Sequence, residues 1–181
     1  MEEAERRGWF GDTVTLEEQL RGLEFALAEA KGKTVLDCGC AEGWIGREFL
    51  KAGAAKVDAF DHSEYMVAEA RKSLGERGRV ELHDVNNPLP TWTEKQYDIV
   101  LALAIIHKGK HVAEIARRFA TLTRDLFVVR LPRKSIGEFG SKHWTTNRVD
   151  MWVEMPRAGL TFERMVQGPK DEMVQYWRRA R

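Results

Sequence analysis

A chain of 181 residues has the length of one domain and buries enough surface to fold without disulfides or metal. Its 43% hydrophobic and 31% charged residues and its net charge of +1 are ordinary for a globular protein, and no apolar run approaches the ~18 residues of a membrane span. The acidic start lacks the features of a secretory signal, and Cys38 and Cys40 stand too close for an ordinary structural bridge, so we expect a reduced, cytoplasmic chain without a membrane segment.

The first 31 residues are predicted to form an arm and a helix. Trp9 and Phe10 lie in a charged stretch and could close over a ligand as a lid, or could simply pack against the domain. Thr15 and Glu18 form a capping-box pattern, and leucines then recur at helical spacing. This pattern predicts one helix from Leu16 to Lys31.

From residue 34 onward, short apolar segments alternate with helical ones. Strands are predicted over 34–38, 56–60, 79–83, 97–103 and 125–131, with helices over 44–52, 63–74, 111–121 and 145–155. Two segments of alternating polarity, 160–167 and 172–179, are joined by a turn and predict a closing antiparallel hairpin. The alternation indicates βαβ units with a parallel sheet, and therefore a single doubly wound α/β domain over residues 1–181. Residues 132–148 form its long loop.

Ligands of such sheets bind beyond the carboxyl ends of the strands, at the switch point after the first strand. Here that point is a turn over residues 39–43. The dinucleotide fingerprint is not met, because Ala41 and Trp44 stand where two of its glycines are required, and no Gly-Lys-Ser/Thr of a P-loop follows. Asp37 and Glu42 flank the turn and would repel a pyrophosphate.

Acidic residues instead mark the ends of the first three strands. They are Asp37, Asp61 and Asp84. A carboxylate at the end of the second strand accepts hydrogen bonds from two ribose hydroxyls, and one after the third strand could accept a bond from an adenine amino group. The pattern suits a cationic nucleoside.

With these motifs, the sequence resembles the class I S-adenosylmethionine-dependent methyltransferases. Residues 35–43 look like the family's first motif, 57–66 its second segment, 82–85 its adenine-contacting motif and 97–104 its fourth-strand motif. The resemblance implies a Rossmann-like sheet of strand order 3-2-1-4-5-7-6 and S-adenosylmethionine as cofactor. It departs from the family at Ala41, which replaces the middle glycine, where we expect slightly less room and no loss of binding.

The resemblance also implies the site residues. The expected cofactor-binding set is Asp37, Gly39, Cys40, Ala41, Gly43, Trp44, Asp61, His62, Asp84, Val85 and Leu103, and no metal is expected. Methyl transfer is an in-line displacement, so the protein mainly positions the two reactants and supplies a suitable electrostatic environment. A general base is needed only if the acceptor arrives protonated. His107, after the fourth strand, is the candidate base, although it could also be an ordinary loop histidine.

Charge is distributed unevenly along the chain. Residues 1–106 carry 13 Lys and Arg against 20 Asp and Glu, whereas residues 107–181 carry 16 against 8. Lys108, Arg130, Arg133 and Lys134 follow the fourth and fifth strands, and we expect them to form a basic rim that favours an anionic acceptor. The acceptor itself stays open among small molecules, peptides and RNA, and the sequence leaves the oligomeric state undetermined.

Two other functions also fit this sequence. A non-catalytic member of the fold would bind or regulate without turnover. Another enzyme that uses S-adenosylmethionine, such as a lyase, would have the same donor site. A nicotinamide-dependent oxidoreductase is disfavoured by the failed fingerprint.

Overall fold

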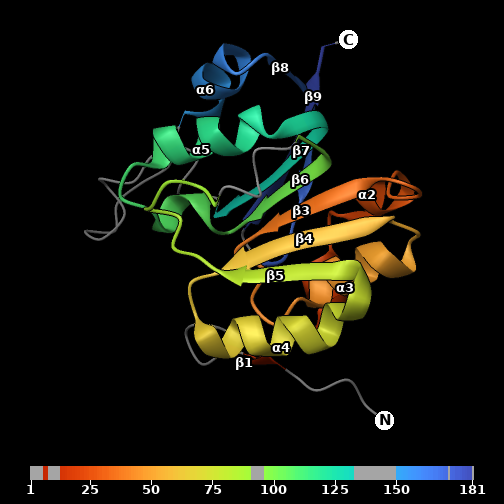
Figure 1. Ribbon diagram of the computed structural model, residues 1–181. Coiled ribbons are helices and arrows are strands. Elements are labelled where there is room, and N and C mark those ends of the chain that lie inside the picture. Colours follow the sequence, from red (N-terminus) through yellow and green to blue (C-terminus); the bar gives the residue numbers. More distant parts are fainter. Residues whose placement is uncertain (1–5, 8–12, 91–95, 133–149, 171, 181) are drawn as a thin grey trace.

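A computed structural model describes residues 6–7, 13–90, 96–132, 150–170 and 172–180. Its elements, in chain order, are β1 (Arg6–Arg7), β2 (Thr13–Val14), α1 (Leu16–Leu20), α2 (Glu24–Ala28), β3 (Thr34–Cys38), α3 (Trp44–Lys51), β4 (Lys56–Asp61), α4 (Glu64–Leu74), the 3₁₀ helix η1 (Gly75–Arg77), β5 (Gly78–Leu82), β6 (Tyr97–Leu103), the 3₁₀ helix η3 (Ile106–Lys108), α5 (Val112–Thr121), β7 (Thr123–Pro132), α6 (Met151–Arg157), β8 (Leu160–Gln167) and β9 (Glu172–Arg179). Figure 1 shows the larger helices packed on both sides of a central sheet.

The main sheet has seven strands in the order β5-β4-β3-β6-β7-β9-β8. Counted from β3 as the first strand, this is 3-2-1-4-5-7-6, so the predicted doubly wound class and strand order are confirmed. The strands from β5 to β7 pair in parallel, and β9 runs antiparallel between β7 and β8 as the predicted hairpin. Consequently the carboxyl ends of six strands, those of β3 to β7 and of β8, and the first residue of β9 meet at one edge of the sheet.

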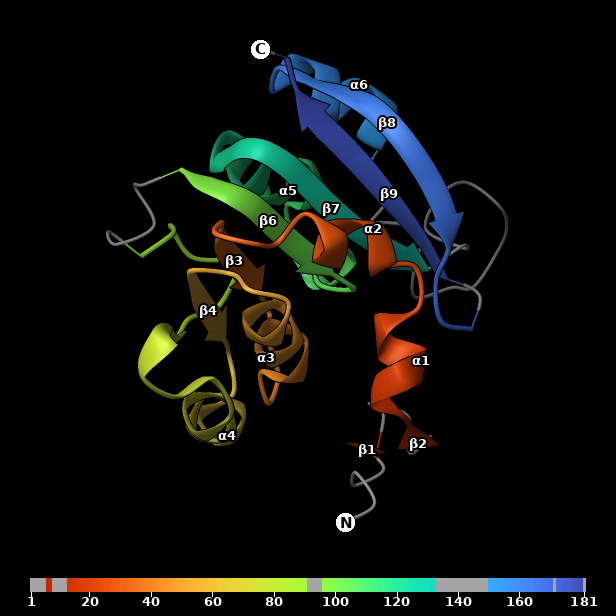
Figure 2. The same ribbon diagram turned by 90° about the vertical axis from the view of Figure 1, so that its right-hand side faces the viewer.

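The core lies in two layers, one on each face of this sheet. On one face α2, α3 and α4 cover an apolar surface that includes Phe49, Val57 and Ile99. On the other face α5 and α6 cover a surface that includes Phe119 and Phe127. Because the central strands are covered on both faces, the apolar run predicted for 97–103 is buried almost throughout. Figure 2 shows α1 standing beside the ends of β7 and β9.

The prediction of one helix over residues 16–31 is wrong. Two short helices, α1 and α2, are separated by a turn in which Gly22 has φ +81°. A Cβ at Gly22 would lie 2.9 Å from the Gln167 carbonyl oxygen, and the buried Tyr176 hydroxyl donates to the Gly22 carbonyl. Packing against the terminal hairpin therefore bends a segment whose leucine spacing favours a continuous helix.

Two other boundaries also differ from prediction. The helix predicted over 145–155 is observed as α6, capped by Asp150, whose side chain accepts from the Trp152 N–H, and it includes Pro156. Residues 145–149 of that prediction lie outside the described part of the chain. β7 extends from Thr123 to Pro132, two residues before and one residue after the predicted strand, and includes Arg130 as the prediction did.

Candidate cofactor site

The turn after β3 is held against the end of β4. The backbone N–H groups of Gly39 and Cys40 both donate to the Phe60 carbonyl, at 2.8 and 3.0 Å. Gly39 has φ +76°, and a Cβ there would lie 2.9 Å from the Ile105 side chain. A larger residue would need both a strained backbone and a displaced isoleucine, so this position requires glycine.

Ala41 and Gly43 complete the turn and lead into α3, whose first residue is the half-buried Trp44. Both have left-handed backbones, with φ +48° and +74°. A Cβ at Gly43 would lie 3.1 Å from the Cα of Ala70, so glycine permits α3 and α4 to approach closely here. For Ala41, the same region costs an L-residue about 1–2 kcal/mol, so the departure from glycine carries backbone strain.

The Asp61 carboxylate is buried and oriented by the backbone. Its Oδ2 accepts from the Ala41 N–H at 3.0 Å, and its Oδ1 accepts from the Ser63 N–H at 3.0 Å. The imidazole Nδ1 of His62 lies 3.2 Å from the same Oδ1. A carboxylate has about four lone-pair sites, and the two backbone N–H groups use two of them, so the group keeps acceptor capacity for hydroxyl donors. The end of β4 thus carries a fixed, pre-oriented acceptor beside the glycine turn.

Asp37 lies one strand away, on the face of β3 that α3 covers. It is only 3% exposed, and its register partners are Ala59 on β4 and Leu101 on β6. Its Oδ2 would lie 3.6 Å from a Cβ added at Gly46 of α3, so the carboxylate and this helix pack closely. The first two predicted acids therefore lie on adjacent strands near one end of the sheet.

Asp84 follows β5 in an exposed loop at the same edge. Its Oδ1 accepts from the backbone N–H of Asn86 at 2.9 Å and from the Asn86 side-chain amide at 2.8 Å. The backbone bond is the largest cause of a lowered Asp84 pKa, and the nearby imidazoles of His62 and His83 lower it further. The next residue, Val85, is buried. The structure thus brings all three acids to one sheet edge.

The end of β6 supplies Leu103 and leads into the loop with His107. Leu103 is half-buried, and Ala104 turns with φ +58° while its N–H donates to the Arg130 carbonyl at 2.9 Å. His107 lies in η3 and is only 3% exposed. Burial, with a contribution from the charge of Lys108, lowers the pKa of His107 to about 4. A histidine of this basicity is neutral at pH 7 and takes up a proton weakly, and its role as a base stays a prediction.

Lys108 is an exposed cation of this loop. The protein around the ammonium group lowers its pKa through desolvation, whereas the carboxylates of Asp61 and Glu172 favour its charged form. Arg130 acts in the opposite direction. Lys108 therefore lies within electrostatic reach of the Asp61 end of the site.

The expectation that Arg130 contributes to an exposed basic rim is wrong. Arg130 is 8% exposed, its Nη1 donates to the Gln19 carbonyl at 2.8 Å, and its Nε lies 3.0 Å from Glu172 Oε2. This side chain joins α1 to the first residue of β9. The predicted strand 125–131 already includes Arg130, and the rim prediction failed because the partners of this side chain, Gln19 and Glu172, come from distant segments of the chain.

Several predicted features lie outside the described residues. They are Trp9, Phe10, Arg133, Lys134 and all of the loop 132–148 except Pro132. Within the described ranges, no group of three His, Cys, Asp or Glu side chains is placed to hold a metal ion. None of the helices described here combines the length and apolar character needed to cross a membrane.

Comparison with known proteins gives one family match. The methyltransferase domain family matches residues 35–125, which include β3 through the start of β7. The malonyl-[acyl-carrier protein] O-methyltransferase of Halalkalibacterium halodurans is 32% identical over 82 residues, which are 43% of this chain and 30% of that protein. The chain spans about a third of the length of the curated relatives it matches.

Solved structures show the same fold over nearly the whole chain. A putative S-adenosylmethionine-dependent methyltransferase from Listeria monocytogenes superposes with a TM-score of 0.72 at 18% identity, covering 92% of this chain and 100% of that one. An S-adenosylmethionine-dependent methyltransferase from Mesorhizobium loti gives a TM-score of 0.71 at 18% identity, covering 90% and 98%. These similarities cover more of the chain than the matched family region does.

Proposed function

Because the chain belongs to the methyltransferase domain family, within the class I S-adenosylmethionine-dependent superfamily, we propose that it methylates a carboxylate oxygen of an anionic acceptor. The observation that carries the donor half is the Asp61 carboxylate, which the Ala41 and Ser63 N–H groups hold beside the glycine turn. S-adenosylmethionine supplies a methyl group on a sulfonium, and attack by an acceptor lone pair leaves S-adenosylhomocysteine.

The residues at this edge fit that donor. Asp61 would accept the two ribose hydroxyls, and Asp84 would accept from the adenine amino group, with His62 and Val85 beside the base. The turn from Gly39 through Gly43, including Cys40, and Trp44 at the start of α3 would flank the rest of the molecule, with Asp37 below it and Leu103 near the methyl group. Carboxylates favour the positive charges of such a donor and disfavour a pyrophosphate.

The acceptor proposal rests on the basicity of His107 and on the position of Lys108. A buried histidine with a pKa of about 4 is poorly suited to remove a proton from a hydroxyl or an ammonium group. A carboxylate is already deprotonated at pH 7, so its lone pair can attack the methyl carbon without a base. The C–S electron pair goes to sulfur, and the product is a methyl ester.

Lys108 gives the anion a place to bind. Its ammonium is partly desolvated, so an incoming carboxylate would stabilise its charged form. The similarity to an enzyme named as an O-methyltransferase supports an oxygen acceptor. We therefore assign Lys108 to acceptor binding and place the acceptor beside Leu103 and His107.

The test uses S-adenosylmethionine labelled in its methyl group and a panel of small carboxylic acids, each paired with its amide. Methyl esters release labelled methanol when treated with base, whereas N-methyl and ether products keep their label. We expect base-labile label with acids only, and Lys108→Gln should raise the acceptor KM about 10-fold, as expected for a lost charged hydrogen bond.

Lys110→Gln is the matched control, because Lys110 is an exposed lysine of the same loop whose backbone contacts survive the change. Base-stable label, or an acceptor KM that Lys108→Gln leaves unchanged, would refute the carboxylate acceptor. Production of a cofactor fragment other than S-adenosylhomocysteine would refute methyl transfer itself.

A further inference from the structure

Asn86 connects two loops of the site that follow different strands. Its side-chain amide and its backbone N–H both donate to Asp84 Oδ1, at 2.8 and 2.9 Å. Its side-chain carbonyl oxygen accepts from the backbone N–H of Lys110 at 2.8 Å. One side chain therefore contacts the acid after β5 and the end of the loop after β6.

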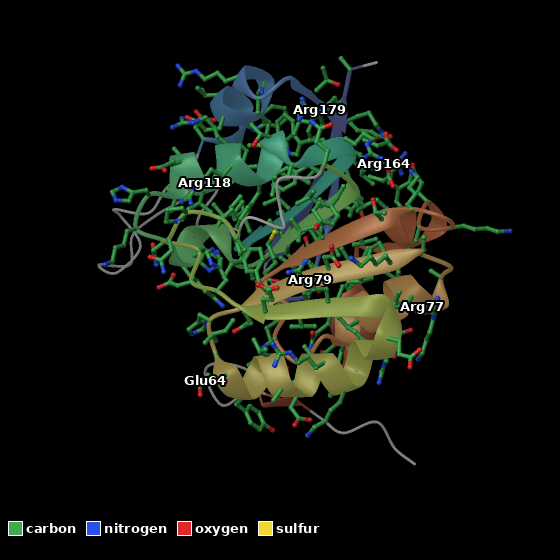
Figure 3. All side chains as sticks on the ribbon, viewed as in Figure 1. Glu64, Arg77, Arg79, Arg118, Arg164 and Arg179 are labelled. Carbon is green, nitrogen blue, oxygen red and sulfur yellow. The ribbon has the colours of Figure 1, made fainter. Side chains whose placement is uncertain are left out.

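Arg118 of α5 holds the same loop from its other side. Its Nη1 donates to the Asn87 carbonyl at 2.7 Å, and its Nη2 donates to the Val85 carbonyl at 3.3 Å. Figure 3 labels Arg118 at the end of the molecule where α4 begins with Glu64, opposite the end that carries Arg77. With the loop backbone held by Arg118, the backbone N–H and the side-chain amide of Asn86 together hold the Oδ1 of Asp84.

We propose that Asn86 is a positioning residue, which orients the Asp84 carboxylate toward the donor and fixes the loop of His107 and Lys108 on the acceptor side. The proposal rests on the proposed function, since it needs Asp84 to contact the donor. The Asn86 side chain makes two contacts, which we call its two arms: its N–H₂ donates to Asp84, and its oxygen accepts from Lys110. An aspartate at this position would keep the arm to Lys110 and lose the arm to Asp84.

The two arms can be tested separately with Asn86→Ala and Asn86→Asp, using S-adenosylhomocysteine as the probe. Asn87→Ala is the control, because the Asn87 bonds to Asp84 and Arg118 run through its backbone and survive the change. We expect Asn86→Ala to weaken binding about 3- to 10-fold, as for one lost hydrogen bond, and Asn86→Asp to weaken it about 10-fold or more at pH 8.

A pH series distinguishes orientation from general damage. In Asn86→Asp the introduced carboxylate lies next to that of Asp84, and at low pH the two groups share a proton. The shared proton again gives Asp84 a hydrogen bond from position 86. The binding deficit relative to wild type should therefore shrink between about pH 8 and pH 5. His62 and His83 face Asp84, and Arg118 holds its loop, and all three residues are present in wild type and in Asn86→Asp alike. The ratio of the two dissociation constants at each pH therefore reports only on the two adjacent carboxylates of the variant.

Amide hydrogen exchange reads the second arm without any ligand. The Lys110 amide should exchange about 10-fold faster in Asn86→Ala and keep its protection in Asn86→Asp, which still offers an acceptor oxygen. The inference is overturned if both variants bind the probe as Asn87→Ala does, if the Asn86→Asp deficit is the same at both pH values, or if the two variants give the same Lys110 exchange. A wild-type protein that does not bind the probe overturns the proposed function instead, and the exchange comparison still tests the bridge between the loops.

Discussion

Asp61 and Asp58 provide a comparison of binding with stability within one strand. Both are buried carboxylates of β4, but they contact different parts of the molecule. Asp61 accepts from backbone groups at the candidate site. Asp58 accepts from the Tyr97 hydroxyl at 2.8 Å and lies 2.7 Å from the ammonium of Lys56. These partners are the first residues of β6 and β4, whereas Asp61 is the last residue of β4. Asp61→Ala should therefore reduce donor affinity, and Asp58→Ala should reduce stability.

The magnitudes follow from what each change removes. Hydrogen bonds to a charged group contribute about 1.5–3 kcal/mol, so loss of the ribose bonds at Asp61 should weaken S-adenosylhomocysteine binding by roughly 10- to 100-fold. Asp58→Ala leaves the Tyr97 hydroxyl buried without its acceptor, which costs about 1–3 kcal/mol of unfolding free energy. The affinity of this second variant should stay within about 2-fold of wild type, because its contacts lie away from the turn.

Calorimetry at one temperature measures both affinities, and urea unfolding measures both stabilities. Asp61→Asn serves as a second variant, since it keeps an acceptor oxygen for the turn if the alanine variant unfolds. Tyr97→Phe should reproduce most of the stability loss of Asp58→Ala and none of a binding loss. Equal losses of affinity in the Asp61 and Asp58 variants would refute the placement of the donor at Asp61.

Three further predictions follow from single side chains. The pKa of His107 is lowered to about 4, so between about pH 6.5 and pH 4 the unfolded chain binds a proton that the folded chain does not. The free energy of unfolding should therefore fall by up to about 3 kcal/mol as the pH drops through this range. Urea unfolding at a series of pH values should show this fall, and His107→Gln should remove it. Arg130→Met removes the partner of Glu172 and should lower the free energy of unfolding by about 3 kcal/mol. A changed acceptor KM at unchanged stability would instead mean that Arg130 binds the acceptor. Ala41→Gly relieves a left-handed alanine at the expense of a more flexible unfolded chain, so thermal unfolding should show a net gain of about 0.5 kcal/mol, and a loss would contradict the strain.

The fold could be predicted because its signals are local. The alternation of apolar strands with amphipathic helices is visible in short windows, and the burial of β6 on both faces explains its uninterrupted apolar run. The break between α1 and α2 could not be predicted in this way. It depends on Gly22 packing against residues of the hairpin more than 140 positions away, including the Tyr176 hydroxyl bond.

The candidate site shows the same division. Asp37, Asp61 and the turn from Gly39 to Gly43 could be placed because strand ends and glycines mark the carboxyl edge of a parallel sheet. The role of Arg130 was missed because its partners, Gln19 and Glu172, come from distant segments.

Asn86 and Arg118 were not singled out by the sequence. The spacing of Asp84 and Asn86 is typical of a side-chain turn and could have indicated the first arm of the bridge. The bonds from Asn86 to Lys110 and from Arg118 to the loop join segments 24 or more residues apart, and only the folded chain brings them together.

The central claim is that the acids and the glycine turn at this sheet edge bind S-adenosylmethionine. Isothermal calorimetry of the wild-type chain with S-adenosylmethionine, S-adenosylhomocysteine, NAD and ATP tests it most directly, with Asp61→Ala measured beside it. We expect saturable binding of the first two ligands, no comparable affinity for NAD or ATP, and a loss of affinity of roughly 10- to 100-fold in the variant. Tight binding of NAD with no response to S-adenosylhomocysteine would contradict it.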